Sequence, residues 1–175
     1  SLAPEELAFV RRQARMYTAY LYFMQVRAGS TAPPVFLRRI EELEQRTGKN
    51  GEQVEAEKLL YTVLRNYSEL SATDRVERIV EALDGSGGNS VLALMLARAY
   101  LENGQPERAI SIYRGLFETD MALACAPFVA TGYAYALAAA GETDEALMQV
   151  RWLHSRNMFS KLSLSLYREL ALEKD

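Results

Sequence analysis

The 175-residue sequence predicts an all-α protein of about nine helices, the later ones arranged as repeated helical hairpins. Three observations predict this class. Apolar residues recur at helical steps of three and four almost throughout, and no segment alternates apolar and polar residues as a half-buried strand does. Gly and Pro residues separate these segments at intervals that suit short connections. One spacing of small and aromatic residues also occurs three times, at intervals of 33 and 37 residues.

Composition agrees with a folded domain and excludes several functions. Apolar residues make up 49% of the chain and charged residues 25%, an ordinary globular balance. The net charge of −3 argues against a general nucleic-acid binder. Residues 1–40 carry six Arg against two Glu, a net +4 that leaves −7 for the remainder, but these charges are too dispersed for a basic arm.

The ends of the chain and its hydropathy bear on cellular location. No run of about 18 apolar residues exists, so we expect no membrane span, and no signal peptide is visible. The chain begins at Ser1 without Met, which we interpret as a cropped start. The location is therefore left open between the cytoplasm and attachment to a membrane or envelope through a part outside this sequence.

The first helix is expected over residues 4–27. Pro4 suits the first helical position, and Glu5 and Glu6 place carboxylates where the helix dipole favours them. The segment GSTAPP ends this helix, and TGKNG, SELSAT and DGSGGN separate the next ones. The remaining helices are expected at about residues 35–46, 53–67, 74–83, 90–103, 106–120, 127–140, 143–156 and 159–172.

The recurring pattern is clearest in the segment LARAYLENGQPERAISIYRGLF. Its members are Leu96, Ala97, Tyr100, Gly104, Ala109, Tyr113 and Leu116. The same steps lead 37 residues later to Tyr133, Ala134, Leu137, Gly141, Ala146, Val150 and Leu153. They lead 33 residues earlier to a degenerate copy, Val63, Leu64, Tyr67, Ser71, Val76, Val80 and Leu83.

Each strong copy has the composition of a tight helical hairpin. Facing Ala residues, Ala97 with Ala109 and Ala134 with Ala146, would let two antiparallel helices approach closely. The Gly of each copy stands at a helix end, where a left-handed conformation costs Gly little. Pro106 suits the first turn of the second helix.

These residues resemble the tetratricopeptide repeat, a 34-residue helix–turn–helix unit that stacks into a superhelix. The resemblance is strong over residues 90–123 and 127–156 and weak over 57–89. Two departures from the family pattern occur. The usual Trp is replaced by Ala93 and Ala130, and the usual Pro is missing after Asp120. We expect the three extra residues between the strong copies to lengthen a helix through residues 118–124.

The resemblance implies a helical-hairpin repeat solenoid that forms one structural unit. Helices in residues 1–50 would pack on an array over 51–175. The array would contain a degenerate repeat, two clear repeats and a capping helix, at residues 57–89, 90–126, 127–158 and 159–172.

In this family the first helix of each pair lines a concave groove where peptides lie. Helical steps place a candidate set of partner-binding residues on that face: Lys58, Tyr61, Arg65, Leu94, Arg98, Leu101, Phe128, Thr131 and Tyr135. Cationic and aromatic side chains in one groove suit an acidic-hydrophobic segment. The groove positions contain no Asn, so the terminal-carboxylate specificity of the chaperone-binding members is not transferred. The alternative is that the protein's own terminal helices fill this face.

No catalytic, cofactor or metal site is expected. His154 is the sole histidine and Cys125 the sole cysteine, they fall in different predicted helices, and neither has the neighbours of a nucleophile motif. The DGSGG segment lacks the Lys-Ser/Thr and the preceding strand of a phosphate loop. The mixed charges of EELEQR and EQVEAEK are typical of a solvated helix face.

The segment MYTAYLYFM, residues 16–24, is apolar nearly all round. Such a helix must be covered on more than one side, so we expect it to pack under the second and third helices. The alternative is a dimer surface or a partner groove, because exposed Tyr residues make good interfaces.

The sequence therefore favours a non-enzymatic scaffold or adaptor that binds another protein or peptide segment and that could form homo-oligomers. The alternative is an interaction domain of a larger envelope, secretion or enzyme assembly whose functional part lies outside this sequence.

Overall fold

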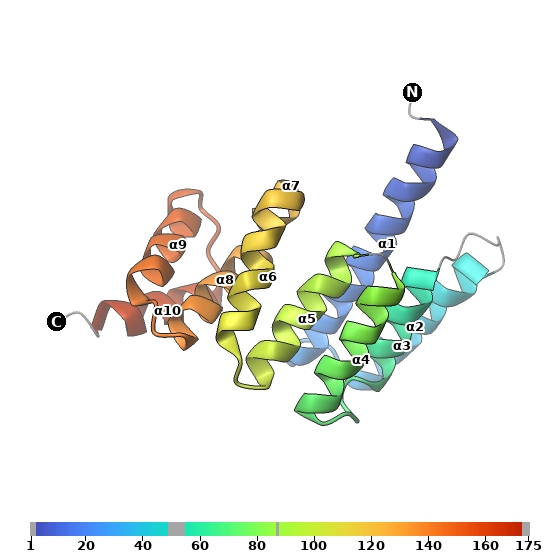
Figure 1. The fold of residues 1–175 in the computed structure, drawn as a ribbon, viewed down its shortest axis with the longest axis horizontal. Coiled ribbons are helices and arrows are strands. Elements are labelled where there is room, and N and C mark those ends of the chain that lie inside the picture. Colours follow the sequence, from blue (N-terminus) through green and yellow to red (C-terminus); the bar gives the residue numbers. More distant parts are fainter. Residues whose placement is uncertain (1–2, 49–54, 87, 173–175) are drawn as a thin grey trace. The chain divides into compact units, whose positions relative to one another are not determined.

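The computed structural model describes residues 3–48, 55–86 and 88–172, and in these ranges it contains ten helices and no strand (Figure 1). The predicted all-α class is confirmed. The chain forms two compact units, residues 1–95 and 96–175. Their boundary falls within α5 (Ser90–Glu102). Among the described helices, none is long and apolar enough to cross a membrane.

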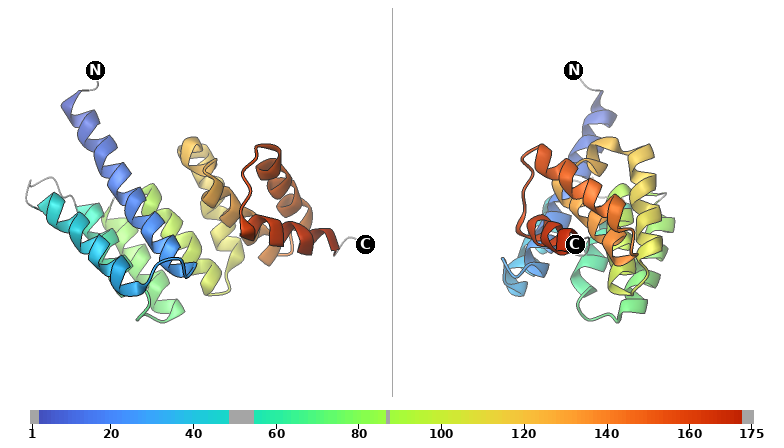
Figure 2. Two further views of the ribbon diagram at one scale, coloured as in Figure 1. Left: turned by 180° about the vertical axis from the view of Figure 1, so that it is seen from behind. Right: turned by 90° about the vertical axis from the view of Figure 1, so that its left-hand side faces the viewer.

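Unit 1 contains four complete helices and the start of α5. The helices are α1 (Pro4–Arg27), α2 (Pro33–Gly48), α3 (Glu55–Asn66) and α4 (Ala72–Gly85). Helix α1 packs against α2 and α3, α2 packs against α3, and α3 packs against α4. Seen from behind, α1 and α2 lie side by side (Figure 2).

The ends of the unit 1 helices follow from local capping. Helix α1 has the predicted bounds, with Pro4 in its first turn, and the Ala3 N–H donates to Glu6 Oε2 at 2.8 Å. Helix α4 begins two residues before its predicted start because Ser71 caps it and accepts from the Asp74 N–H at 3.2 Å. The predicted start of the third helix, residue 53, lies outside the described residues.

The degenerate repeat closes its hairpin with an arginine. Arg75 of α4 donates from Nε to the Tyr67 carbonyl oxygen at 2.6 Å, just beyond the end of α3. The Arg75 guanidinium also lies 4.5 Å from the centre of the Tyr67 ring. A charged donor therefore satisfies a carbonyl at the helix end, where the strong copies use a Gly turn.

An aromatic cluster fills the middle of the unit 1 core. Phe23 of α1 meets Tyr67 edge-on at 4.7 Å between ring centroids and lies 6.4 Å from Phe36 of α2. Met16, Ala19, Tyr20 and Phe23 of α1 are all buried. The prediction that residues 16–24 pack against the second and third helices is confirmed.

Unit 2 begins with the end of α5 and contains five further helices. They are α6 (Pro106–Thr119), α7 (Met121–Ala124), α8 (Pro127–Ala139), α9 (Thr143–Ser155) and α10 (Lys161–Leu172). Helix α8 is central, since it packs against α6, α7, α9 and α10.

Two hairpin turns in unit 2 have the predicted glycine geometry. Gly104 and Gly141 adopt positive φ angles of 67° and 80°. At the first turn the Gly104 N–H donates to the Leu101 carbonyl and the Gln105 N–H to the Tyr100 carbonyl, at 3.1 and 2.8 Å. The turn at Gly141 repeats both bonds, so each Gly ends its helix in the same way.

The predicted lengthening of a helix through residues 118–124 is wrong. Helix α6 ends at Thr119, and α7 is a separate helix of four residues. Asp120 lies between them with φ −146° and ψ 70°, which is not helical, and its side chain accepts from the Leu123 N–H at 3.1 Å. The Asp side chain competes for a backbone donor, so a new helical turn begins here.

Small residues let the unit 2 helices approach closely. Ala109, Ala134 and Ala146 have no exposed surface. Gly132 of α8 lies against the Tyr113 ring of α6, and a Cβ at Gly132 would come within 2.6 Å of the Tyr113 hydroxyl oxygen. Tyr113 is 4% exposed and packs against Tyr133, so its ring has little room to move.

We therefore expect Gly132→Ala to lower the free energy of unfolding by ~1–2 kcal/mol, because overpacking outweighs the helix propensity of Ala. Gly115→Ala in α6 is the matched control, since its Cβ would meet nothing within 4 Å. That variant should be more stable by ~0.5–1 kcal/mol. Urea unfolding measures both changes, and equal stabilisation of the two variants would contradict the close contact.

Candidate functional site

In unit 1 three of the expected groove residues lie on α3 and the fourth, Leu94, lies on α5. Tyr61 is fully buried and Leu94 is 1% exposed, so neither offers surface to a partner. Arg65 forms an ion pair with Glu44 of α2 and is partly exposed. Lys58 is exposed, with Nζ 3.9 Å from Glu55 of its own helix. The protein itself therefore buries Tyr61 and Leu94 and pairs Arg65 with α2, and of the four only Lys58 is exposed with its described ion pair on its own helix.

In unit 2 the expected residues lie on α5 and α8, and they differ in exposure. Thr131 is 6% exposed, and its hydroxyl donates to the Pro127 carbonyl at 2.7 Å. Arg98 pairs with Glu102 one turn further along α5, at 3.1 Å. Leu101 and Phe128 are half-buried, and Tyr135 is 47% exposed.

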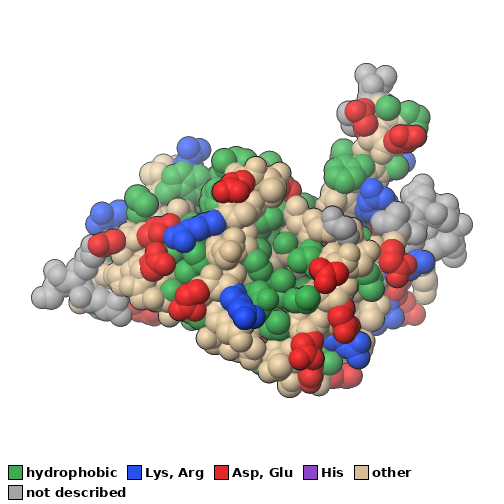
Figure 3. Space-filling view, in the orientation of Figure 1, with side chains coloured by type: hydrophobic (Ala, Val, Ile, Leu, Met, Phe, Trp, Pro, Cys, Tyr) green, Lys and Arg blue, Asp and Glu red, His purple; other side chains and the backbone are tan. Residues whose placement is uncertain are grey.

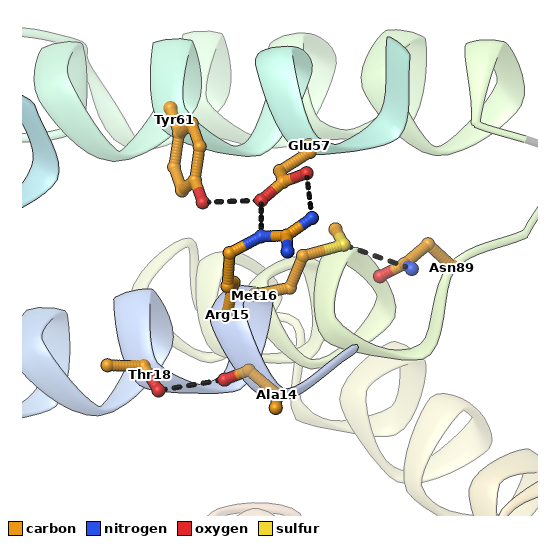
Figure 4. Close-up of polar contacts among 7 residues, drawn as sticks. All are labelled: Ala14, Arg15, Met16, Thr18, Glu57, Tyr61 and Asn89. Carbon is orange, nitrogen blue, oxygen red and sulfur yellow. Dashed lines mark hydrogen bonds and ion pairs between the residues drawn. The ribbon is translucent and has the colours of Figure 1, made fainter. Parts of the chain in front are cut away.

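The most buried polar cluster of unit 1 joins Arg15 of α1 to Glu57 and Tyr61 of α3 (Figure 4). Arg15 donates from Nε to Glu57 Oε1 at 2.8 Å and from Nη2 to Oε2 at 3.2 Å. The Tyr61 hydroxyl also donates to Glu57 Oε1, at 2.8 Å. Three donors thus surround a carboxylate that has no exposed surface.

The interpretation of EQVEAEK as a solvated helix face is wrong for Glu57, which has no exposed surface. The carboxylate is in the core because Glu57 shares one helix stripe with Leu60, Tyr61 and Leu64, all of which are buried. That stripe is visible in the sequence and could have placed Glu57 inside. The partner could not be found in this way, because Arg15 is 42 residues away.

The environment of Tyr61 keeps its phenol protonated. Burial, together with the hydrogen bond to the Glu57 carboxylate, raises the pKa of Tyr61 far above its ordinary value of 10.0. The hydroxyl therefore acts as a donor that holds Glu57 in place. This cluster connects α1 to α3.

A second polar cluster joins three helices of unit 2. Tyr133 of α8 donates from its hydroxyl to Glu145 Oε1 of α9 at 2.7 Å. Arg114 of α6 donates from Nε to the Tyr133 hydroxyl oxygen at 3.2 Å and from Nη2 to Glu145 Oε2 at 3.0 Å. Arg114 Nη2 also lies 3.6 Å from Glu142.

The charges in this second cluster stabilise one another. The hydrogen bond from Tyr133, followed by the charge of Arg114, lowers the pKa of Glu145 below its ordinary value. Burial and the bond to Glu145 raise the pKa of Tyr133. Sequence reasoning missed this cluster because its members come from three separate helices.

His154 belongs to α9, and Cys125 directly follows the end of α7. His154 lies in the last turn of α9, its ring 4.9 Å from Phe159 and 5.5 Å from Tyr167, and its Nε2 is buried without a hydrogen-bond partner in the described structure. Cys125 is half-buried, with Sγ 3.8 Å from Met121 Sδ. Among the described residues, no group of three or more His, Cys, Asp or Glu side chains is placed to hold a metal ion.

The Glu145 cluster predicts a pH dependence of stability. A carboxyl group whose pKa is lower in the folded state contributes stability above its unfolded pKa, and loses it as pH falls through the folded pKa. The wild type should thus exceed Glu145→Gln in free energy of unfolding by the largest amount at about pH 6. This excess should shrink below about pH 4.5.

Urea unfolding at a series of pH values measures this difference. Glu118→Gln is the control, because Glu118 is exposed on α6 and the described residues give it no ion pair. A difference between the wild type and Glu145→Gln that stays constant from pH 3 to pH 7 would contradict the cluster.

Comparison with known proteins gives no match. No protein-family model, no curated protein and no solved structure matches the chain. The resemblance to the tetratricopeptide repeat therefore rests on residue spacing.

Proposed function

We propose that the protein is a non-enzymatic interaction scaffold that binds a segment of another protein through the first helices of its unit 2 hairpins. The observation that carries this proposal is Tyr135. It is 47% exposed on α8, a helix in which most other side chains are buried. A large aromatic side chain held on a rigid helix loses little entropy when it is covered, which makes it a good anchor for a partner.

Two further apolar side chains of unit 2 are partly exposed. Phe128 stands on the same stripe of α8, seven residues before Tyr135, and Leu101 lies in the last turn of α5. Both are half-buried and keep part of their apolar surface accessible. We include Leu101, Phe128 and Tyr135 in the proposed surface, whose apolar side chains then come from two helices of one unit.

Arg98 adds a positive charge to the proposed surface, but this charge is already paired within the chain. Its Nε already lies 3.1 Å from Glu102, so an acidic group on the partner must compete with that carboxylate. The side chains of Arg98 and Glu102 are 28% and 18% exposed, so this ion pair is partly buried and an acidic partner group would have to replace Glu102. We therefore assign most of the affinity to the apolar side chains, and to Arg98 a preference for acidic partners.

A peptide selection tests this proposal. The 175-residue chain would be immobilised and used to select from a phage-displayed library of random 16-residue peptides. We expect enriched peptides to combine acidic and apolar residues. Tyr135→Ala should weaken a selected peptide at least about tenfold, the loss expected when an interface anchor is truncated.

Met148→Ala is the matched control, because Met148 is 61% exposed on α9, outside the proposed surface. It should change the affinity less than about twofold. Circular dichroism confirms that the variants remain folded. Failure to enrich any peptide, or equal losses for Tyr135→Ala and Met148→Ala, would contradict the proposal.

A further inference from the structure

Helix α1 carries a second apolar stripe besides the one that enters the core. The core stripe is Met16, Ala19, Tyr20 and Phe23. The second stripe, on the opposite side of the helix, consists of Ala3, Leu7, Val10, Ala14, Tyr17 and Leu21. Its members alternate steps of four and three residues, the spacing of a heptad seam that packs against another helix.

This seam is largely uncovered. Leu7, Val10 and Leu21 are 38%, 50% and 42% exposed, Ala3 and Ala14 are exposed, and Tyr17 is half-buried. Residues 3–10 are all exposed, and within unit 1 the first turns of α1 project beyond α2 and α3 (Figure 1). Hydrophobic side chains are visible on this projecting part in Figure 3.

A projecting helical segment without packing partners is marginally stable in water. Covering its apolar seam would therefore stabilise both the helix and the assembly. The seam is self-complementary by position, because a heptad stripe on one helix matches the same stripe on an identical helix.

We propose that a second copy of this chain covers the seam and forms a parallel two-helix coiled coil through α1. In heptad terms Leu7, Ala14 and Leu21 take the a positions, and Val10 and Tyr17 take d positions. This interface lies on unit 1 and is independent of the surface proposed on unit 2.

The charges beside the seam select the parallel orientation. Glu6 directly precedes Leu7, and Arg11 directly follows Val10, so they occupy g and e positions on opposite flanks. In a parallel pair the g residue of one helix lies beside the e residue five positions later in the other. Glu6 of each copy would thus pair with Arg11 of the other, whereas an antiparallel pair would bring the two Arg11 flanks together.

The expected affinity of the dimer follows from the length of the seam. The seam spans fewer than three heptads, so the interface belongs to the small, transient class. We therefore expect a monomer of 19.7 kDa in equilibrium with a dimer at concentrations of ~10–500 µM.

Analytical ultracentrifugation of the 175-residue chain over this concentration range tests the proposal. The wild type should dimerise, and Leu7→Arg with Val10→Arg should weaken the dimer at least about tenfold. Phe9→Arg is the matched control, since Phe9 is 52% exposed on the same projecting part but lies off the seam, beside Arg12. It should dimerise as the wild type does.

Exchanging the charges of Glu6 and Arg11 distinguishes the loss of the parallel ion pair from a loss of helix folding. Glu6→Arg and Arg11→Glu should each weaken the dimer, and the double variant should recover it because the pair is restored with reversed sign. Loss of the helix cap that Glu6 provides would not be recovered in this way. A monomeric wild type throughout the range, a dimer insensitive to the seam variants, or no recovery in the double variant would overturn the proposal.

Discussion

The arrangement of unit 1 depends on one buried charge. Glu57 has no exposed surface, and a carboxylate in the core is tolerated when strong donors surround it. Arg15, supplied by α1, provides two of those bonds, and Tyr61 provides the third. Because the Arg15 fork must meet Glu57, α1 can pack on α3 in one rotation and one register.

That rotation has consequences along the whole of α1. It directs Met16 and Phe23 into the core, where Phe23 completes the aromatic cluster with Phe36 and Tyr67. It also directs the second stripe, including Leu7 and Val10, away from α3 and into solvent. The feature that orders the interior of unit 1 therefore also determines which surface is left for association. In unit 2, by contrast, small residues at helix contacts set the spacing of α6 and α8.

Local sequence signals predicted the helices well, and tertiary contacts less well. The bounds of α1 and the turns at Gly104 and Gly141 follow from periodicity and backbone preference, which act within a few residues. Helix α7 was missed because the Asp120 side chain overrode helical continuity. The partners Arg15 and Glu57 could not be matched from the sequence, because pairing across 42 residues depends on how helices pack. For the same reason, this face of α3 was expected to line an open groove. The packing of α1 and α2 against α3 could not be foreseen from the sequence.

A double-mutant cycle on Arg15 and Glu57, with unfolding free energies measured in urea, tests whether this ion pair holds α1 on α3. We expect Arg15→Met to lower the free energy of unfolding by ~3–5 kcal/mol, because it leaves a buried carboxylate without its cation. Glu57→Gln removes the charge, so Arg15→Met should cost much less in that background, with a coupling energy above ~1 kcal/mol. Two substitutions whose effects add to within ~0.5 kcal/mol would contradict the claim that this pair holds α1 in place.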